Sequence, residues 1–390
     1  MSSQVATRVE GRDGFEGSNV SGDEPRTPLP SQPSPGDSNM ELRYGDRREI
    51  GRGGMGRVYQ VLDKDLNRNV AMKVLSGGKI DRDSEFRFVA EAQISGQLEH
   101  PALLPIHDIG IDGDGRSFFT MRYVPDHETL EDVIELLKAG NQDAHEIYTM
   151  KRRVQIIQRV CDALTYAHLR GVVHRDIKPS NILIGSTGEI YLADWGVACL
   201  LSQESDDSVD TNLSDGPDDE GKLIGTPLYM SPEQLMANGA ITAKSDVYSL
   251  CAVAYELFTL THYLGPNPPV SALTIYETIT ECPRIDAEHY LHPVGGRVPR
   301  QISRVLRHGL QHNRADAIDS AAELEAALQR WVEGTAPIVC PGTFLQSWLG
   351  KTSRAIDRRP VAFPIVLIVA FGVLVASITT TALTIVNRLG

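Results

Sequence analysis

The sequence predicts an α+β protein with two lobes, a small β-rich lobe followed by a larger helical lobe. Short apolar and β-branched runs, separated by turn residues, fill the chain between residues 44 and 124. Beyond residue 124 the apolar residues recur mainly at helical spacing. The 390 residues are 41% hydrophobic and 23% charged, which is sufficient for one large or two ordinary domains with a buried core.

Residues 1–42 are expected to form a disordered leader. They are rich in Gly, Ser, Pro and charge, and the run 25–35 cannot bury enough apolar surface to fold. The leader also lacks the apolar core of a signal peptide. The folded domain is therefore expected at 43–334, with the small lobe at 43–124 and the helical lobe at 125–334.

The small lobe is predicted to contain two hairpins and one helix. Apolar runs at 58–62 and 69–75 flank a turn-rich segment, which is typical of a hairpin. Apolar residues at helical spacing then predict an amphipathic helix at 86–98. Two more strand-like runs, at 103–109 and 118–124, are separated by Asp-Gly turn residues.

Three helices of the larger lobe can be placed from their apolar residues. The first has one apolar face between Val154 and Ala167, and the last covers 321–331. The second, at 247–260, is apolar on all sides, so we expect it to be buried.

A glycine-rich segment at 50–58 has the spacing G-x-G-x-x-G at Gly51, Gly53 and Gly56. Glycines let the backbone approach phosphate oxygens, to which its N–H groups can donate. Ordinary turns and dinucleotide-binding folds share this spacing. A dinucleotide site would place the glycines before a helix, whereas a predicted strand follows here, which argues against that fold.

Lys73 and Glu91 are the next candidates for a phosphate site. Lys73 lies in an apolar strand about 20 residues after the glycines. A single strand lysine is usually a surface residue with a buried stem, but the upstream glycine segment favours a phosphate contact. Glu91 lies on the predicted helix, either as a solvent-exposed glutamate or as the ion-pair partner that positions Lys73.

The segment 174–181, His-Arg-Asp-Ile-Lys-Pro-Ser-Asn, supplies three chemically suited side chains. Asp176 can accept a hydrogen bond from a substrate hydroxyl, Lys178 can neutralise a moving phosphoryl group, and Asn181 can hold a metal ion. Asp194, which begins Asp-Trp-Gly after a predicted strand, is a hard ligand suited to Mg²⁺. Any one of these residues could be a surface residue, but their joint order indicates phosphoryl transfer.

These segments resemble Hanks-type (eukaryotic-like) serine/threonine protein kinases, in particular the bacterial membrane-anchored members. The resemblance covers about 44–331 and includes, in order, the glycine loop, the strand lysine, the catalytic loop, the metal aspartate and a Pro-Glu motif. It implies the bilobal protein kinase fold, with ATP in the cleft between the lobes. It also implies Mg²⁺, or Mn²⁺ in its place, and protein substrates with Ser or Thr.

The resemblance also implies the contacts to ATP. By analogy, Ile50 and Val58 would cover the adenine, Met121 would be the gatekeeper, and the backbone of 122–124 would form the hinge that bonds the base. The complete set of expected nucleotide-site residues is Ile50, Gly51, Gly53, Gly54, Gly56, Val58, Lys73, Glu91, Met121, Arg122 and Val124. Catalysis is assigned to Asp176 and Lys178, and metal binding to Asn181 and Asp194.

The acceptor class follows from two further segments. Lys178 with Pro179, and the stretch 225–233 (Gly-Thr-Pro-Leu-Tyr-Met-Ser-Pro-Glu), resemble the serine/threonine class. Thr226 would bond Asp176 and Lys178 and shape the pocket for the hydroxyl. The analogy also implies structural roles: an ion pair of Glu233 with Arg314, and a bond from Asp246 to the catalytic-loop backbone.

The activation segment is expected at 194–233, and it is acidic between 202 and 220. Its candidate phosphosites are Ser202, Ser205, Ser208, Thr211 and Ser214. A phosphate there could pair with Arg175 and order the loop. The alternative is that the acidic residues already serve this purpose or merely keep the loop solvated.

Two residues depart from the family pattern, Trp195 in place of Phe and Ser231 in place of Ala. Neither is a phosphate or metal ligand, although the larger Trp195 is expected to hinder an inactive flip of the Asp194 turn. Two other functions are compatible with parts of this pattern. A pseudokinase or scaffold usually lacks the strand lysine or one of the two aspartates, and a small-molecule kinase generally lacks the 225–233 segment.

Residues 361–386 contain no charged residue and are long enough to span a membrane, since about 20 apolar residues suffice. A buried core helix is the alternative. Four basic residues lie at 351–359, before the segment, and only Arg388 follows it, so the preceding domain is expected on the cytoplasmic side of the cell membrane. Residues 335–360 would be a juxtamembrane linker, and 387–390 a short external tail.

Charge and cysteine content limit the remaining partners. The net charge of −13 argues against nucleic-acid binding through the overall field. The five cysteines lack CxxC spacing, which indicates neither a zinc knuckle nor a disulfide framework. Gly372 and Ala376 have the small-xxx-small spacing of self-associating membrane helices, a weak pattern that permits self-association.

Overall fold

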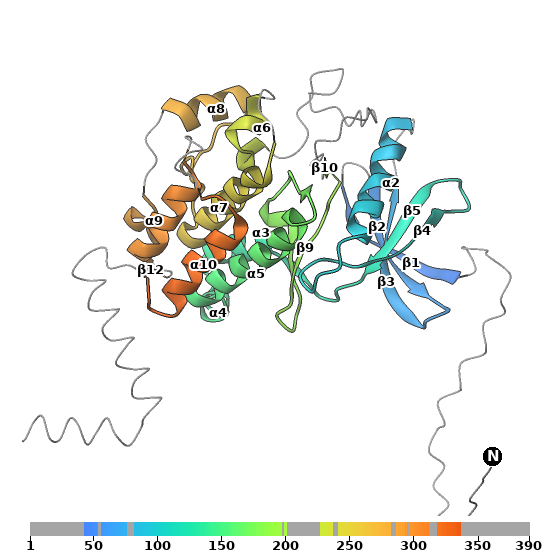
Figure 1. Ribbon diagram of the computed structural model, residues 1–390. Helices are drawn as coiled ribbons and strands as arrows, with labels where there is room; N and C mark the ends of the chain where they lie inside the picture. Colours follow the sequence, from blue (N-terminus) through green and yellow to red (C-terminus); the bar gives the residue numbers. More distant parts are fainter. Residues whose placement is uncertain are drawn as a thin grey trace, which may run out of the picture. The chain divides into compact units, whose positions relative to one another are not determined.

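The structure is a computed structural model. It describes residues 43–53, 56–75, 82–196, 199–200, 227–236, 241–281, 286–292, 294, 296–311 and 318–336. All of these residues belong to one compact unit, 40–390, which Figure 1 shows as a β-sheet with an attached helix and a group of helices.

The small lobe is a five-stranded antiparallel sheet with the strand order β1-β2-β3-β5-β4. Its strands are β1 (Tyr44–Arg52), β2 (Gly56–Asp63), β3 (Arg68–Leu75), β4 (Ile106–Ile111) and β5 (Ser117–Arg122), and its helix is α2 (Arg82–Gly96). The first predicted hairpin is confirmed, since β2 pairs with β3 over eight residue pairs. That register sets Val58 opposite Lys73.

The side chains of β3 lie alternately on the two faces of the sheet, because successive side chains of a strand point to opposite sides. Val70, Met72 and Val74 pack with Tyr44 and Phe118 in one apolar cluster. On the opposite face, Leu75 packs with Phe88 and Ala92 of α2. Lys73 shares the face of Leu75, so the strand directs it toward α2.

Two boundaries in the small lobe differ from the prediction. Helix α2 begins four residues before the predicted 86–98 and ends two residues earlier. The strand predicted at 103–109 begins only at Ile106, and Leu103 instead forms an isolated bridge to Leu192. Pro105 precedes the strand and has no backbone N–H to donate, which accounts for the late start.

The larger lobe is mainly helical, as predicted. Its helices are α3 (Leu130–Lys138), α4 (Gln142–Ile147), α5 (Met150–His168), α6 (Pro232–Met236), α7 (Ala243–Thr259), α8 (Ala272–Glu281), α9 (Arg300–Gly309) and α10 (Ala321–Val332). Short strands connect them: β6 (Glu128–Thr129), β7 (Val172–Val173), β8 (Ile182–Ile184), β9 (Ile190–Leu192), β10 (Cys199–Leu200), β11 (Leu291–His292) and β12 (Gly296–Arg297). The 3-10 turns are η1 (Pro179–Asn181), η2 (Pro227–Tyr229) and η3 (Ala287–His289).

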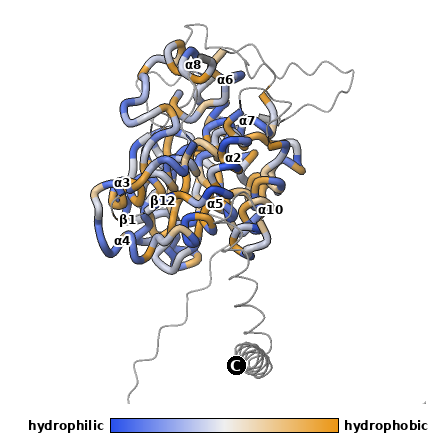
Figure 2. Tube along the Cα trace, turned by 90° about the vertical axis from the view of Figure 1, so that its left-hand side faces the viewer, coloured by the Kyte–Doolittle hydropathy of each residue, from blue (hydrophilic) through white to orange (hydrophobic). Residues whose placement is uncertain are grey.

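Helix α7 forms the centre of the larger lobe, and all of its residues from Ser245 to Thr259 are buried, as predicted. Helices α5 and α10 pack around it with one apolar face each; Figure 2 shows hydrophilic and hydrophobic residues mixed along α5. Side-chain caps fix the starts of several helices. Thr149 accepts a hydrogen bond from Arg152 N–H at α5, and Ser320 accepts one from Glu323 N–H at α10.

Several predicted features lie outside the described residues. They are the leader 1–42, the acidic part of the activation segment with Thr226, Gly54, Arg314, the linker from residue 337 onward, the membrane segment 361–386 and the tail 387–390. Within the described part of the chain, no helix combines the length and apolar character needed to cross a membrane.

Candidate active site

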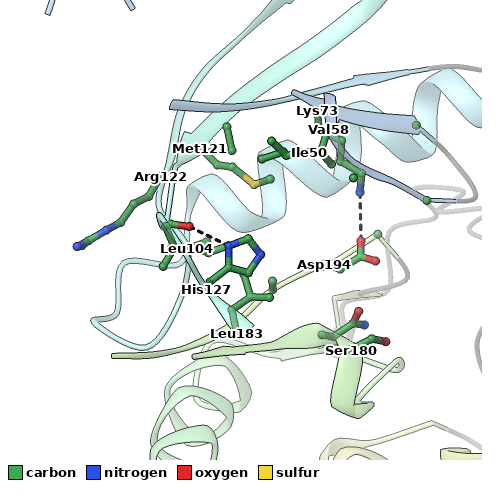
Figure 3. Close-up of a pocket in the computed structure, with 18 of the residues that line it drawn as sticks. Ile50, Val58, Lys73, Leu104, Met121, Arg122, His127, Ser180, Leu183 and Asp194 are labelled. Atoms are coloured by element: carbon green, nitrogen blue, oxygen red, sulfur yellow. Dashed lines mark hydrogen bonds and ion pairs between the residues drawn. The ribbon is translucent and has the colours of Figure 1, made fainter. Parts of the chain in front are cut away.

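A cleft of about 560 Å³ brings residues of the small lobe together with residues of the larger lobe. The small lobe contributes side chains from β1, β2, β3, α2 and β5, and the larger lobe contributes 176–183 and 193–196. Figure 3 shows Lys73 and Asp194 facing each other at one part of the cleft, and the apolar side chains of Met121, Leu104 and Leu183 at another. Such a division suits a ligand with an apolar end and an anionic end.

Lys73 joins the two lobes through its ammonium group. Its Nζ lies 2.6 Å from Glu91 Oε1 and 3.1 Å from Asp194 Oδ1. Figure 3 shows Lys73 pointing from β3 across the cleft to Asp194. Although burial opposes the charge, the two carboxylates raise the pKa of Lys73, so it stays protonated at neutral pH. Asp194 is only partly shielded from water, and the cost of this partial desolvation is outweighed by Lys73, which lowers the pKa of this carboxyl.

Helix α2 positions Glu91 through its packing on the sheet. Phe88 and Ala92, on the adjacent turns of α2, are buried against Phe119 of β5. A hydrogen bond nearer the start of the helix also connects it to β5, since Ser117 Oγ donates to Glu85 Oε1 at 2.9 Å. Glu91 is only 4% exposed, so its ion pair with Lys73 is shielded from water.

Asp246 of α7 binds the backbone of the loop at 174–176. Asp246 is 1% exposed, and its two oxygens accept the backbone N–H groups of His174 and Arg175, each at 2.8 Å. Asp246 Oδ2 also lies 2.8 Å from His168 Nε2. These bonds confirm the structural role expected for Asp246. They also stabilise Arg175 in the left-handed region (φ 69°), which is unfavourable for a residue with a Cβ.

Asp176, Lys178 and Asn181 form one hydrogen-bonded group on the floor of the cleft. Lys178 Nζ donates to Asp176 Oδ2 at 2.7 Å. Asn181 Nδ2 donates to the backbone carbonyl of Asp176 at 2.8 Å and lies 3.3 Å from its Oδ2. The turn η1 brings Asn181 back to Asp176 five residues away, so the carboxylate is fixed by its own loop.

Asp194 and the two residues after it make a strained turn at the end of β9. Asp194 is in the left-handed region (φ 65°), and its side chain remains 46% exposed toward the cleft. A Cβ on Gly196 would lie 3.1 Å from Glu91 Oε2, a close contact that would require Glu91 to shift by a few tenths of an ångström. Trp195 is 4% exposed, and its ring centroid lies 4.5 Å from that of His174.

Gly53 and Gly56 of the glycine segment line the cleft and are hydrogen-bonded to each other. Gly53 N–H donates to the Gly56 carbonyl at 2.8 Å. A Cβ at Gly56 would lie 2.5 Å from the Val74 carbonyl oxygen, whereas nothing lies nearer than 3.8 Å to one at Gly51 or 4.0 Å to one at Gly53. Glycine at Gly56 is therefore required by the close approach of β3, and the other two leave room beside the backbone.

Nearly all the residues predicted for the site line the cleft. Every described member of the predicted nucleotide, catalytic and metal sets lines it, and only Gly54 lies outside the described residues. Tyr123, which belongs to the predicted hinge 122–124, also lines the cleft. Sequence reasoning missed further lining residues: Arg52, Ala71, Leu104, His127, Ser180, Leu183, Ala193 and Gly196. Strand periodicity could have found Ala71, which lies two residues before Lys73 on the same face.

Metal ligands are few in the cleft. Among the described residues, no group of three or more His, Cys, Asp or Glu side chains could hold a metal ion. Asn181 and Asp194 still fit a Mg²⁺ site, because Mg²⁺ is commonly bound by one or two protein oxygens together with phosphates and water.

The fold and the cleft define a two-lobed protein with a lysine–carboxylate pair in the same cleft as a hydrogen-bonded aspartate. Comparison with known families is specific: the protein kinase domain family matches residues 44–313, and the chain belongs to this family.

Curated relatives share this part of the chain. The chain is 30% identical over 308 residues to serine/threonine-protein kinase PknD of Protochlamydia amoebophila, covering 75% of this chain and 30% of that protein. It is 32% identical over 310 residues to PknD of Chlamydia trachomatis, covering 75% and 32%. It is 31% identical over 305 residues to PknB of Mycobacterium tuberculosis, covering 77% and 44%. The chain thus spans less than half the length of these relatives.

Proposed function

We propose that this chain is an ATP-dependent serine/threonine protein kinase. The observation that carries the proposal is the position of Lys73, bonded to Glu91 and Asp194, in the same cleft as the Asp176–Lys178–Asn181 group. Family membership and the printed names of the relatives support the same activity.

The charged side chains would act on the phosphates of ATP. Lys73 Nζ is held in place by Glu91, so it is oriented toward a phosphate before ATP binds. Asp194 and Asn181 would hold the metal ion, which in kinases is Mg²⁺ or Mn²⁺. The metal would supply positive charge that neutralises the transferred group.

Asp176 would orient the acceptor hydroxyl and accept its hydrogen bond. Its carboxylate is kept in position by Lys178 and Asn181, and Lys178 can also approach the transferred group. The serine/threonine preference rests on Lys178, Pro179 and the 225–233 segment together with the names of the relatives. Because the lysine and both aspartates meet in one cleft, transfer is favoured over a pseudokinase that only binds nucleotide and partners.

The proposal extends to the cellular setting of the kinase. Residues 361–386 would anchor it in the cell membrane and the basic residues before them would keep the kinase domain in the cytoplasm. Its substrates would be cytoplasmic proteins in signal transduction, and the kinase would also phosphorylate its own acidic loop. Mass spectrometry after incubation with ATP tests the last point, and a loop without phosphate between residues 202 and 226 would contradict it.

The test of the activity uses radiolabelled ATP, a generic protein substrate and the full-length chain in three forms. Wild type is compared with Asp176→Asn and with Asp143→Asn, a control that removes an exposed carboxylate on α4. We expect transfer to fall roughly 100- to 10,000-fold in Asp176→Asn, because the hydroxyl loses its acceptor, and to persist in the control. Wild type no faster than Asp176→Asn would refute the kinase assignment.

A further inference from the structure

Gln234, the third residue of α6, connects the catalytic loop to the end of the predicted activation segment. Its Nε2 lies 2.7 Å from the backbone carbonyl oxygen of Arg175, which is 59 residues earlier in the chain. Its Oε1 accepts hydrogen bonds from the backbone N–H and from the hydroxyl of Ser231, each at 3.0 Å. Ser231 directly precedes α6 and is fully buried.

The bonds to Ser231 determine which end of the Gln234 amide faces the catalytic loop. A backbone N–H can only donate, so the atom that faces Ser231 N must be the amide oxygen. The amide nitrogen then faces Arg175 and donates to its carbonyl. Gln234 therefore joins the two segments with an acceptor at one end and a donor at the other, and an ionised Glu could supply only the acceptor.

The carbonyl that Gln234 binds belongs to the peptide group between Arg175 and Asp176. The N–H of the same peptide group donates to His174 Nδ1 at 3.3 Å, so both of its polar atoms are held. The preceding N–H, that of Arg175, donates to Asp246 Oδ1 at 2.8 Å. Because Arg175 has a φ of 69°, its backbone keeps this conformation only where its surroundings hold it, and the adjoining peptide sets the position of Asp176.

We propose that Gln234 is a positioning residue, which fixes the 175–176 peptide so that the Asp176 carboxylate accepts the hydrogen bond of the substrate hydroxyl. The inference rests on the proposed function, since it concerns the acceptor side of phosphoryl transfer. A hydroxyl must be aligned with the phosphoryl group, so a small displacement of Asp176 lowers the rate of transfer. Gln234 is not among the residues that line the cleft, and ATP binding should therefore not depend on it.

Helix capping is the purely structural alternative for Gln234. Ser231 and Gln234 have the S-x-x-E/Q spacing of a capping box, in which Glu and Gln serve equally as acceptors for the N–H of the first residue. Gln234→Glu therefore keeps the cap and removes only the donor to Arg175. If capping is the whole role of Gln234, this variant should transfer phosphate at the wild-type rate.

The experiment measures kcat and KM for ATP with the full-length chain as wild type, Gln234→Glu and Gln142→Glu. We expect kcat of Gln234→Glu to fall about 3- to 10-fold, the range for one hydrogen bond, while KM for ATP changes by less than about 2-fold. Gln142→Glu makes the same chemical change at the exposed first residue of α4 and should keep both constants. Gln234→Met, which loses the donor without adding a charge, takes the place of Gln234→Glu if that variant does not fold.

A second comparison asks whether Gln234 acts through Asp176. Residues that act as one unit have non-additive effects on the rate. In the Asp176→Asn background, Gln234→Glu should therefore lower the residual kcat by less than about 2-fold. A general weakening of the larger lobe would lower kcat by the same factor in both backgrounds.

The outcomes separate the positioning role from the kinase assignment. A wild-type kcat in Gln234→Glu would overturn the positioning role and leave the kinase assignment intact. An equal fall in both backgrounds, or a loss that lies entirely in KM for ATP, would also overturn it. A wild-type chain that transfers no phosphate from ATP would overturn the proposed function and the inference together.

Discussion

The side chain of Lys73 shows how strongly a single residue depends on its partners. A buried ammonium group without a carboxylate would be costly, and here Glu91 and Asp194 both lie within hydrogen-bonding distance. The same two bonds couple α2, β3 and the end of β9. The catalytic activity of the cleft should therefore depend on Glu91, although Glu91 need not contact the substrate.

We predict that Glu91→Gln lowers kcat/KM for ATP by roughly 10- to 100-fold, the range for one charge-assisted hydrogen bond. The physical reason is that Lys73 loses the partner that orients it, while the packing of α2 is kept. Steady-state kinetics on the full-length chain measures the change. Glu99→Gln, an exposed glutamate after α2, is the control, and equal rates in all three proteins would contradict the role of this ion pair.

The protonation of His262 should affect the stability of the fold. It is 5% exposed, and burial lowers its pKa to about 4, with nearby Glu256 opposing the shift and Lys138 adding to it. An unfolded histidine titrates near pH 6.5, so the unfolded chain binds more protons between about pH 6.5 and 4. The stability that the fold retains because His262 is neutral in both states is therefore complete above about pH 6.5. As the pH falls below this value, protonation of His262 in the unfolded chain lowers the free energy of unfolding.

We predict that His262 alone lowers the free energy of unfolding by about 2 kcal/mol on going from neutral pH to about pH 5. Denaturant unfolding of the detergent-solubilised chain at both pH values measures the total loss. His262→Phe retains a ring of similar size but cannot be protonated, so it should lose less stability on acidification. A loss as large as that of wild type would show that other groups account for the acid sensitivity.

At the scale of elements, α9 approaches α7 so closely that a side chain cannot fit at one position. A Cβ added at Gly309, the last residue of α9, would lie 2.1 Å from Cys251 Sγ and 3.0 Å from Cys251 Cβ. Cys251 is fully buried in the rigid centre of α7, so it has little room to move.

We therefore predict that Gly309→Ala destabilises the fold by about 1–3 kcal/mol, the usual cost of overpacking. Thermal unfolding of the full-length chain checks this value. Gly96→Ala at the end of α2 meets nothing within 4 Å and serves as the control, for which we expect no loss. If both variants unfold at the wild-type temperature, the close packing of α9 on α7 is not as described.

The element boundaries also show what the sequence could and could not indicate. The hairpin β2–β3 and the buried helix α7 were predictable, because apolar periodicity and turn residues mark them directly. The first turn of α2 was missed because residues 82–85 are polar and carry no apolar period. The late start of β4 follows from Pro105, whose effect depends on which backbone groups are paired.

That the predicted site residues line one cleft could be expected from the sequence, because protein kinases carry particular residue types at fixed spacings. The roles of these residues stay predictions. His127 could not be predicted, since its position depends on the left-handed backbone of Asp126 and on a carbonyl three residues away. The tie between Lys138 and Glu256, 118 residues apart, likewise exists only in the folded chain. Contacts of this kind have no local signal in the sequence.

At the scale of the whole molecule, the proposed membrane anchor is a separate claim from the kinase activity. We predict that the full-length chain stays in the membrane fraction after an alkaline wash, because the uncharged segment 361–386 is longer than the roughly 20 residues needed to span the bilayer. A variant lacking residues 361–390 should move to the soluble fraction. Full-length chain released by the wash would contradict the anchor.

We propose that this cleft transfers phosphate from ATP to a serine or threonine hydroxyl. Phosphoamino-acid analysis of a substrate labelled by the full-length chain tests it most directly. We expect label on phosphoserine or phosphothreonine with wild type and almost none with Asp176→Asn. Label on phosphotyrosine, or equal labelling by both proteins, would contradict it.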